Sequence, residues 1–411
     1  MQYQQNPIRA KLIFALILSL ACGAFADSTF VAVTDTNVLN GLSPLNWVRK
    51  TDFIASSICG ASLKAGFTGT GRVSLRVDTR NLATKVAARF PILAWSVNLG
   101  PLQTHQLIQG ETSVLLSTGV ANPSIDFYLK GISPFENRYA GDAPDNAVKI
   151  TGFVLDAGGS CRPVTQQAGL WMNIGNSIES GDAAAYASGQ GRPPDDNWAA
   201  SDDGRASYGY LLAKHYGYRE SRLAYGGYNW GGGGAGCPNL SGLLDNITST
   251  VSRLTGGVFV PRPDIVLINL GENGVPASAD VIDALTKLRL RAGAATRIIV
   301  MIPVSGTSRA AVTDAYTAYR QKSNDPDIHL VDLGKLTFAT ADGQHPTAAG
   351  HVSIYNAALP AFDKIIPQPT GLHAIPAQAK NPLMTAPMTI NARDSKGRRT
   401  GIPVGILYSP R

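Results

Sequence analysis

The sequence predicts an α/β fold in two parts, an all-β domain followed by a three-layer domain with a parallel sheet between helices. Up to about residue 160, apolar and polar residues alternate in short runs, and from residue 170 short apolar runs alternate with segments of helical period. Period-two alternation is typical of half-buried strands, and strand–helix alternation is typical of a parallel sheet covered on both faces. With 411 residues, 44% of them hydrophobic, the chain is long enough to bury two cores.

The first 26 residues predict an export signal that is cleaved after Ala26. Arg9 and Lys11 form a basic start, Leu12 to Ala21 form an apolar run, and Ala24-Phe25-Ala26 has the small-x-small form of a cleavage site. The apolar run is too short to span a bilayer, and no later stretch reaches the ~20 apolar residues that a spanning helix needs. We therefore expect a secreted or periplasmic protein without a membrane span.

Residues 27–160 predict a β-sandwich of the jelly-roll type. Short alternating runs separated by turn clusters, such as Gly66 to Gly69, are typical of these folds. A small, Gly-rich segment that ends at Pro163 follows, so we expect an interdomain linker at 161–169. The alternating runs are 73–77, 93–99, 125–129 and 149–155.

Residues 170–366 predict the parallel sheet with its helices, and 367–411 a basic, Pro-containing extension in which 388–408 reads as a hairpin. The expected strands are 170–174, 222–225, 265–270, 298–302 and 329–333, and the expected helices are 206–215, 240–254, 279–291, 310–322 and 348–362.

Positive charge is concentrated in the C-terminal extension. The chain has a formal net charge of +7, and the segment after residue 370 holds six basic residues against one acidic residue. Such a tail can contact an anionic surface such as acidic glycan or lipid headgroups, or it can simply be solvated. No basic stripe interleaved with aromatic residues is present, so we expect no nucleic-acid partner.

Three cysteines, Cys59, Cys161 and Cys237, follow the predicted signal. Their spacing matches no metal-ligand pattern, so no zinc site is predicted. In an oxidising compartment we expect one disulfide and one remaining thiol, and the sequence leaves the pairing open. A lipidated N-terminus at Cys22 is an alternative, although the preceding Ser19-Leu20-Ala21 is a poor lipoprotein signal.

Residues that can carry chemistry follow the predicted strands at their carboxyl ends, where ligands of parallel sheets bind. Ser177 follows the first strand in a tight turn between small residues, a place where a serine hydroxyl is exposed as a nucleophile. Gly226 and Gly227 follow the second strand, and glycine lets backbone N–H groups face a ligand. Asn273 follows the third strand and offers a side-chain amide donor.

Asp342 and His345 follow the fifth strand, just before the last predicted helix. A carboxylate three residues before a histidine can orient the imidazole and stabilise its charged form. Each of these features is common by itself. A serine or asparagine at a strand end is usually part of a turn, and a single histidine is more often structural than catalytic. Their joint occurrence in this order, each at the end of a strand, predicts a hydrolase site.

These four blocks make residues 170–365 similar to the SGNH (GDSL-type) hydrolase superfamily, whose blocks contribute Ser, Gly, Asn and His in that order. The resemblance implies a flavodoxin-like three-layer fold, with Ser177 as nucleophile, His345 as general base and Asp342 as the residue that orients His345. The oxyanion hole that it implies comprises the N–H of Ser177, the N–H of Gly226 or Gly227, and the amide of Asn273.

Two positions depart from the pattern of that superfamily. Its first block usually reads Gly-Asp-Ser and its third Gly-x-Asn-Asp, whereas this chain has Asn176 and Gly274. Asn176 is isosteric with aspartate and can still accept backbone hydrogen bonds, but it carries no charge. These departures leave open the alternative that the protein is catalytically inactive and binds glycan.

The order of the two domains resembles carbohydrate esterase family 2, which comprises secreted enzymes that remove acetyl groups from plant cell-wall polysaccharides. The resemblance implies an O-acetylesterase for acetylated polysaccharide or oligosaccharide, with no metal and no cofactor. It also implies an aromatic residue that supports the sugar ring, for which Trp230, Tyr228 and Trp198 are the candidates. A lipase or thioesterase with the same catalytic residues is the alternative, and it would need a long apolar groove.

Overall fold

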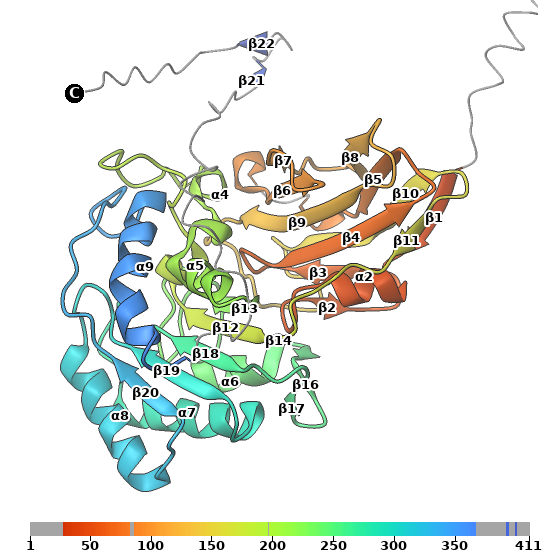
Figure 1. Cartoon of the computed structure of the whole chain (residues 1–411). Helices are drawn as coiled ribbons and strands as arrows, with labels where there is room; N and C mark the ends of the chain where they lie inside the picture. Colours follow the sequence, from red (N-terminus) through yellow and green to blue (C-terminus); the bar gives the residue numbers. More distant parts are fainter. Residues whose placement is uncertain (1–27, 83–85, 196, 367–391, 394–398, 401–411) are drawn as a thin grey trace, which may run out of the picture. The chain divides into compact units, whose positions relative to one another are not determined.

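Two antiparallel β-sheets form the first part of the chain (Figure 1). One has the strand order β2-β3-β10-β5-β8 with β1 paired to β10, and the other has the order β11-β4-β9-β6-β7. Phe67 of β4 and Phe153 of β10 meet edge to face in the shared core, with ring centroids 5.1 Å apart. The elements are β1 (Ser28–Ala32), α2 (Thr36–Gly41), β2 (Val48–Arg49), β3 (Ile54–Ser56), β4 (Ser62–Thr68), β5 (Arg72–Val77), η2 (Arg80–Leu82), η3 (Ala87–Arg89), β6 (Ile92–Val97), β7 (Gln103–Gln106), β8 (Ser113–Thr118), β9 (Ser124–Gly131), β10 (Val148–Asp156) and β11 (Ser160–Arg162).

The computed structural model describes residues 28–82, 86–195, 197–366, 392–393 and 399–400. The expected signal 1–26 and most of the extension 367–411 lie outside these residues. The chain divides by its contacts into residues 1–368 and 369–411. In the second unit, β21 (Ala392–Arg393) pairs antiparallel with β22 (Arg399–Thr400), within the range expected for a hairpin. Among the described helices, none has the length and apolar character needed to cross a membrane.

The alternating runs lie in β5, β6, β9 and β10, as the sequence predicts. Two details of the sequence interpretation are wrong. The segment Gly66 to Gly69 is not a turn cluster, because β4 extends to Thr68 and buries the Phe67 side chain completely. The linker is shorter than expected, because Cys161 and Arg162 belong to β11 and pair with β4. The jelly-roll connection of the strands stays a prediction.

A five-stranded parallel sheet forms the second part, in the order β13-β12-β18-β19-β20. Numbered from β12, this is the order 2-1-3-4-5 of flavodoxin-like folds. The strands are β12 (Leu170–Gly175), β13 (Arg219–Ala224), β18 (Ile265–Ile268), β19 (Arg297–Met301) and β20 (Ile328–Val331), and the helices are α3 (Ser177–Ser180), α4 (Trp198–Ser201), η4 (Gly204–Ala206), α5 (Tyr208–His215), α6 (Leu240–Asp245), α7 (Ser278–Ala292), α8 (Arg309–Ser323) and α9 (Ala348–Phe362).

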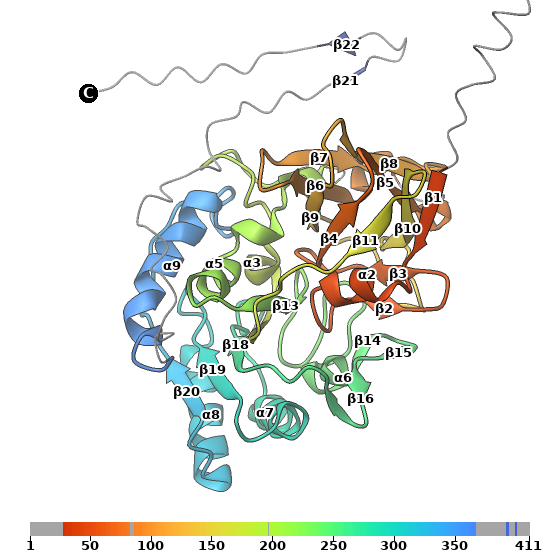
Figure 2. The same cartoon turned by 45° about the vertical axis from the view of Figure 1, so that its right-hand side comes forward.

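Successive residues of the central strands point to opposite faces of the sheet and pack under different helices. Leu267 of β18 and Ile299 of β19 belong to the cluster formed with α5 and α9, whereas Val266 and Val300 belong to the cluster formed with α6, α7 and α8. The strands are therefore apolar on both faces, as expected for a parallel sheet covered by helices on each side. Figure 2 shows α5 and α9 side by side over one face.

The helix expected at 240–254 ends at Asp245. The chain continues as β14 (Asn246–Thr248), β15 (Val251–Ser252), β16 (Leu254–Thr255) and β17 (Val258–Phe259), which form two small hairpins. The β-branched residues Ile247, Thr248, Thr250 and Val251 follow one another closely here, and such residues favour strands over helices.

The expected disulfide is not present among the described cysteines, which are all free thiols. Cys59 is buried and its Sγ lies 2.8 Å from the carbonyl oxygen of Lys130. Burial raises the pKa of Cys161 to about 11 and that of Cys237 to about 12, so both stay protonated at neutral pH.

The outer face of β9 joins the two parts of the fold. Asp126, Tyr128 and Lys130 alternate on this face and each bonds to the segment that follows α4. Asp126 accepts a hydrogen bond of 2.6 Å from Arg205, Tyr128 donates to the carboxylate of Asp203 at 3.3 Å, and Lys130 donates to the carbonyl oxygen of Asp202. The outer face of β9 therefore contacts the second domain and is not exposed to solvent at these residues.

Arg222 of β13 is a second connection, and its side chain is 1% exposed. Its guanidinium donates to Glu220 at 2.5 Å and 2.9 Å and to the Ser207 hydroxyl at 3.0 Å. It also donates to the carbonyl oxygens of Cys59, in the first domain, and Ser180, at the end of α3, both at 3.4 Å. The Arg222 guanidinium is thus hydrogen-bonded to the first domain, to α3 and to Ser207, the N-cap residue of α5.

Replacement of this cation is expected to destabilise the whole chain. In Arg222→Met, Glu220 keeps a nearly buried carboxylate without its partner, which costs about 3–5 kcal/mol of the free energy of unfolding. Urea unfolding measures the loss. The matched control is Arg80→Met, because Arg80 pairs with Asp78 at the surface and its side chain is 87% exposed. Equal unfolding midpoints for the two variants would contradict the role of Arg222.

Candidate active site

Ser177, His345 and Asp342 meet at the carboxyl edge of the parallel sheet. The Ser177 hydroxyl oxygen lies 3.1 Å from Nε2 of His345, and Nδ1 of His345 lies 2.7 Å from Oδ2 of Asp342. With Nδ1–H donated to Asp342, Nε2 is free to accept the proton of the serine hydroxyl. The sequence brings together three side chains separated by up to 168 positions in the arrangement of a Ser-His-Asp nucleophile.

Ser177 is placed by a capping box at the start of α3. Asn176 accepts the N–H of Ile178 through its side chain at 2.9 Å, and Glu179 accepts the N–H of Asn176 at 2.9 Å. A Cβ on Gly175 would overlap the Glu179 carboxylate, so only glycine fits before the box. The asparagine that replaces aspartate therefore still performs the local capping role.

A buried network supports this turn from below. Glu179 accepts a hydrogen bond of 2.6 Å from the Tyr208 hydroxyl. The oxygen of this hydroxyl in turn accepts the side-chain N–H of Asn269 at 2.7 Å. Burial raises the pKa of Glu179 to about 7, against the opposing effect of its bonds from Tyr208 and Asn176. The sequence reasoning missed these residues, although the spacing of Asn176 and Glu179 is the signature of a capping box.

Asp342 is bound to the same loop that carries His345. Its Oδ1 accepts the backbone N–H groups of Gln344 at 3.0 Å and His345 at 2.8 Å. Burial acts to raise the pKa of Asp342, but the bonds from the His345 backbone and ring outweigh it, and the pKa lies below its usual value. The carboxylate is therefore ionised at neutral pH and can stabilise a positive imidazole ring.

The loops after β13 and β18 emerge beside the serine. β12 pairs with both strands, with Gly175 opposite Ala224 and Ile174 opposite Ile268, so Gly226 and Asn273 leave the sheet at the same edge as Ser177. Asn273 donates one side-chain N–H to the carbonyl oxygen of Tyr228 at 3.0 Å, which leaves its second N–H for a ligand.

Trp230 and Tyr228 do not reach the site surface. Trp230 is 1% exposed and donates its indole N–H to the carbonyl oxygen of Leu270 at 3.1 Å. Tyr228 is fully buried and its hydroxyl donates to Pro238 at 2.9 Å. The prediction that these two rings contact the substrate is wrong for this structure, because both are buried and pack in the hydrophobic core.

Trp198 lies against His345. Its ring meets the His345 ring edge to face at a centroid distance of 5.7 Å. Phe135, from the loop after β9, packs edge to face on Trp198 at 5.6 Å, and Pro134 of the same loop lies beside Gly226. The first domain thus contributes to the wall of the site, which the sequence reasoning did not anticipate.

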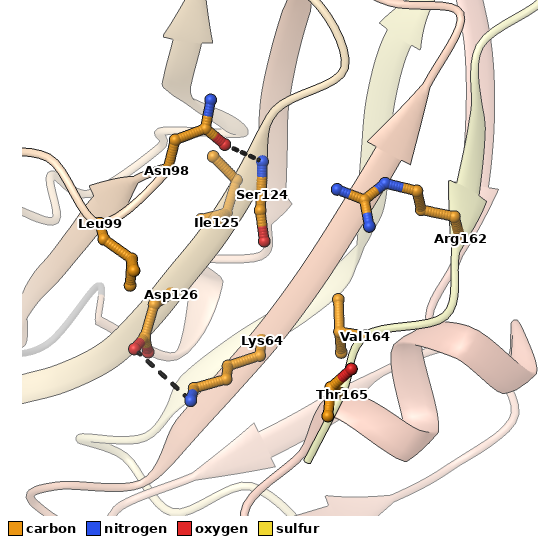
Figure 3. Close-up of a pocket in the computed structure, with 9 residues that line it drawn as sticks. All are labelled: Lys64, Asn98, Leu99, Ser124, Ile125, Asp126, Arg162, Val164 and Thr165. Carbon is orange, nitrogen blue, oxygen red and sulfur yellow. Dashed lines mark hydrogen bonds and ion pairs between the residues drawn. The ribbon is translucent and has the colours of Figure 1, made fainter. Parts of the chain in front are cut away.

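A separate cavity of about 360 Å³ lies on the first domain (Figure 3). It is polar in part, and neither Ser177 nor His345 lines it. No group of three or more His, Cys, Asp or Glu side chains in the described residues is arranged to hold a metal ion. The cavity is lined by Lys64, Asn98, Leu99, Ser124, Ile125, Asp126, Arg162, Val164 and Thr165.

The raised pKa of Glu179 predicts a pH dependence of stability. Its pKa of about 7 exceeds the usual 4.5, so the folded chain binds this proton more tightly, and stability falls as pH rises from about 4.5 through 7. The shift corresponds to roughly 3 kcal/mol. In Glu179→Gln, the drop in melting temperature between pH 5 and pH 8 should be smaller than in the wild type. Asp195→Asn, at an exposed position, should keep the wild-type drop; an unchanged drop in Glu179→Gln would rule out this role.

Comparison with known proteins identifies the fold. No protein-family model and no curated protein sequence matches the chain. A family two carbohydrate esterase from Cellvibrio japonicus is similar in structure, with a TM-score of 0.64 and 16% identity, over 82% of this chain and 98% of that one. An acetyl xylan esterase from the rumen bacterium Butyrivibrio proteoclasticus has a TM-score of 0.63 and 16% identity over the same shares.

A salicylyl acyltransferase from a tetracycline biosynthetic pathway is also similar, with a TM-score of 0.53, 14% identity, and coverage of 84% of this chain and 99% of that one. The similarity therefore extends over both domains. The chain therefore shares the two-domain fold of these family two carbohydrate esterases.

Proposed function

We propose that the protein is a secreted serine esterase that removes O-acetyl groups from carbohydrate. The single observation that carries the proposal is the contact of Ser177, His345 and Asp342 at the carboxyl edge of the sheet. The structural similarity to an acetyl xylan esterase supports the carbohydrate ester as substrate class. The predicted signal 1–26 supports export.

The reaction proceeds through an acyl-enzyme. The Ser177 hydroxyl oxygen attacks the acetyl carbonyl carbon while its proton moves to Nε2 of His345. The N–H groups of Ser177 and Gly226 or Gly227, with the Asn273 amide, stabilise the oxyanion. His345 then gives this proton to the sugar oxygen. The bond between that oxygen and the carbonyl carbon breaks, and the acetyl group remains on Ser177. Water then attacks this ester while His345 takes its proton; the bond to the Ser177 oxygen breaks, His345 returns the proton to that oxygen, and acetate is released.

Acetate release tests the proposal. The mature wild-type protein should release acetate from 4-nitrophenyl acetate and from acetylated xylan, and Ser177→Ala should release none from either. A fluorophosphonate should label the wild type at Ser177. If the wild-type protein releases acetate from neither ester and is not labelled, the proposed esterase function is wrong.

The acyl-chain preference separates the proposal from the lipase or thioesterase alternative. Trp198 packs against His345 and Phe135 packs against Trp198, so we expect activity on acetyl esters and little on octanoyl esters. A preference for octanoyl esters would favour the alternative.

Asn273 is expected to act on turnover more than on substrate affinity. Asn273→Ala should lower kcat by about 10²-fold with a small change in KM, because an oxyanion donor acts mainly in the transition state. Asn273→Asp keeps the shape but places a negative charge there, and it should lose at least as much. A change confined to KM would reassign Asn273 to substrate binding.

A glycan-binding protein without catalysis is the second candidate. The cavity on the first domain favours it, because Lys64, Arg162 and the Asn98 amide provide hydrogen-bond donors there (Figure 3). It predicts glycan binding that Ser177→Ala preserves and no labelling of the wild type. Labelling of Ser177 would exclude it.

A further inference from the structure

The outer face of the sheet β11-β4-β9 brings charged and small residues together beneath the cavity of Figure 3. Arg162 of β11 stands opposite Gly66 of β4, and Gly66 stands opposite Ser124 of β9. Two residues further along the same strands, Lys64 stands opposite Asp126. Opposite residues in antiparallel strands, and residues two apart along one strand, point to the same face. The cavity of about 360 Å³ therefore lies over one continuous face of the sheet.

Arg162 reaches across this face because Gly66 has no side chain. A Cβ on Gly66 would stand 2.9 Å from Cζ of Arg162, so a larger residue would displace the guanidinium. Nε of Arg162 donates to the carbonyl oxygen of Phe67 at 3.3 Å, and Figure 3 shows the guanidinium directed across β4 toward Ser124. A guanidinium has five N–H donors, so this single bond leaves the others for a ligand.

The two cations of the cavity have no close carboxylate partner. Asp126, the acidic residue in the lining, accepts a hydrogen bond of 2.6 Å from Arg205. Nζ of Lys64 lies 4.0 Å from the other oxygen of this carboxylate, and the Lys64 side chain is 41% exposed. Arg162 forms no ion pair with a residue that the structure describes. Both side chains can therefore bind an anion without first losing a strong ion pair.

A second hollow of about 60 Å³ continues the cavity toward the α/β domain. The two hollows share Lys64 and Asp126 in their lining, and we call them together the groove. The second hollow is also lined by Lys214 of α5 and Arg219 of β13. Within the described part of the chain neither of these two cations has an ion pair, and Nε of Arg219 has no hydrogen-bond partner. The groove therefore spans both domains.

Positive charge predominates along the groove. Two carboxylates line it, and each already binds an arginine: Asp126 binds Arg205, and Glu220 binds the buried Arg222. A ligand that carries negative charges at intervals complements such a surface. The cations that remain are Lys64, Arg162, Lys214 and Arg219.

The other lining residues indicate what kind of anion fits. Neutral side chains with hydrogen-bonding groups lie between the cations, and they suit the hydroxyl groups of a sugar chain. The cavity over the sheet has aliphatic walls at Leu99 and Val164, and none of its lining residues is aromatic, so bases of a nucleic acid would find no ring to stack on. The neutral hydrogen-bonding residues are Asn98, Ser124 and Thr165 in the first hollow and Ser43, Ser62, Gln166 and Gln167 in the second.

We propose that the groove is a second binding site, separate from the candidate active site, for an oligosaccharide whose sugar units carry carboxylate groups. Arg162 and Lys64 bind carboxylates of the sugar units over the sheet, and Lys214 and Arg219 bind those further along the chain. Neither Ser177 nor His345 lines the groove. The proposal goes beyond the esterase function and does not depend on it.

Tetragalacturonate, a short chain of uronic acid units, tests the ligand class by isothermal titration calorimetry. It should bind at least about tenfold more tightly than the carboxyl-reduced tetramer, in which each carboxylate has become a neutral hydroxymethyl group. Its affinity should fall about tenfold between roughly 50 mM and roughly 500 mM NaCl, because salt screens exposed charges. Equal affinity for the reduced tetramer, or for citrate, which has carboxylates but no sugar chain, would overturn the proposal.

Replacement of the cations tests the place of binding. Arg162→Gln should weaken tetragalacturonate binding at least about tenfold, and Arg162→Lys should weaken it less, because lysine keeps the charge but not the planar fork. Lys64→Gln is the second variant, and it should also weaken binding. The matched control is Arg80→Gln, which removes the same charge from the same domain at a side chain that is 87% exposed and lines neither hollow.

Thermal melts confirm that each variant is folded. An equal loss of affinity in Arg80→Gln and Arg162→Gln would assign binding to the overall charge and overturn the proposed site. A wild-type protein that does not bind tetragalacturonate would overturn it as well. Acetate release tests the esterase function independently, so failure of one proposal is distinguishable from failure of the other.

Discussion

The buried guanidinium of Arg222 is the constraint on which the geometry of the candidate site depends. A cation that is removed from water must be satisfied on all sides, and here its partners are the Glu220 carboxylate, the Ser207 hydroxyl and the carbonyl oxygens of Cys59 and Ser180. Three of those partners belong to the first domain, to the end of α3 and to the start of α5, and Glu220 lies on β13 with Arg222. Even Gly60 is required, because a Cβ there would stand 2.9 Å from the guanidinium. Arg222 thus links the sandwich to Ser180, three residues after Ser177, in addition to the contacts of β9.

Three carboxyl environments within the site differ because burial and hydrogen bonding act in different proportions. Asp342 receives two backbone N–H groups and the His345 ring, so the ionised form is favoured. Glu179 receives the Tyr208 hydroxyl and one N–H group but is wholly buried, and its pKa rises to about 7. Burial raises the pKa of Asp182, and the His345 charge, the Ser180 hydroxyl, Arg138 and the Trp198 indole oppose this rise. Carboxyl groups of the same chemistry are thus shifted in different directions by their surroundings.

The sequence was sufficient for the parts of the structure that depend on local order. The alternation of β5, β6, β9 and β10, the five parallel strands, and the positions of Ser177, Asp342 and His345 at strand ends follow from periodicity and turn residues. The rest depends on contacts between distant segments. Burial of Trp230, the approach of Phe135 to Trp198 and the burial of Asp182 and Asp202 each depend on how segments far apart in the sequence pack together. The helix expected at 240–254 failed for a local reason, because the β-branched run after Asp245 competes with helical spacing.

The segment 130–138 shows why the first domain is part of the site and not an appendage. It leaves β9 and delivers Lys130 to the carbonyl oxygen of Asp202, Pro134 to Gly226 and Phe135 to Trp198. Arg138 donates to the carbonyl oxygen of Ser57 and lies over the Tyr225 ring, and its positive charge lowers the pKa of the buried Asp182 and Asp202. Without this segment, Trp198 beside His345 would lose its contact with Phe135, and Asp202 would lose the positive charges of Lys130 and Arg138. The first domain therefore completes the surroundings of His345 through charged, polar and aromatic side chains that contact the α/β domain.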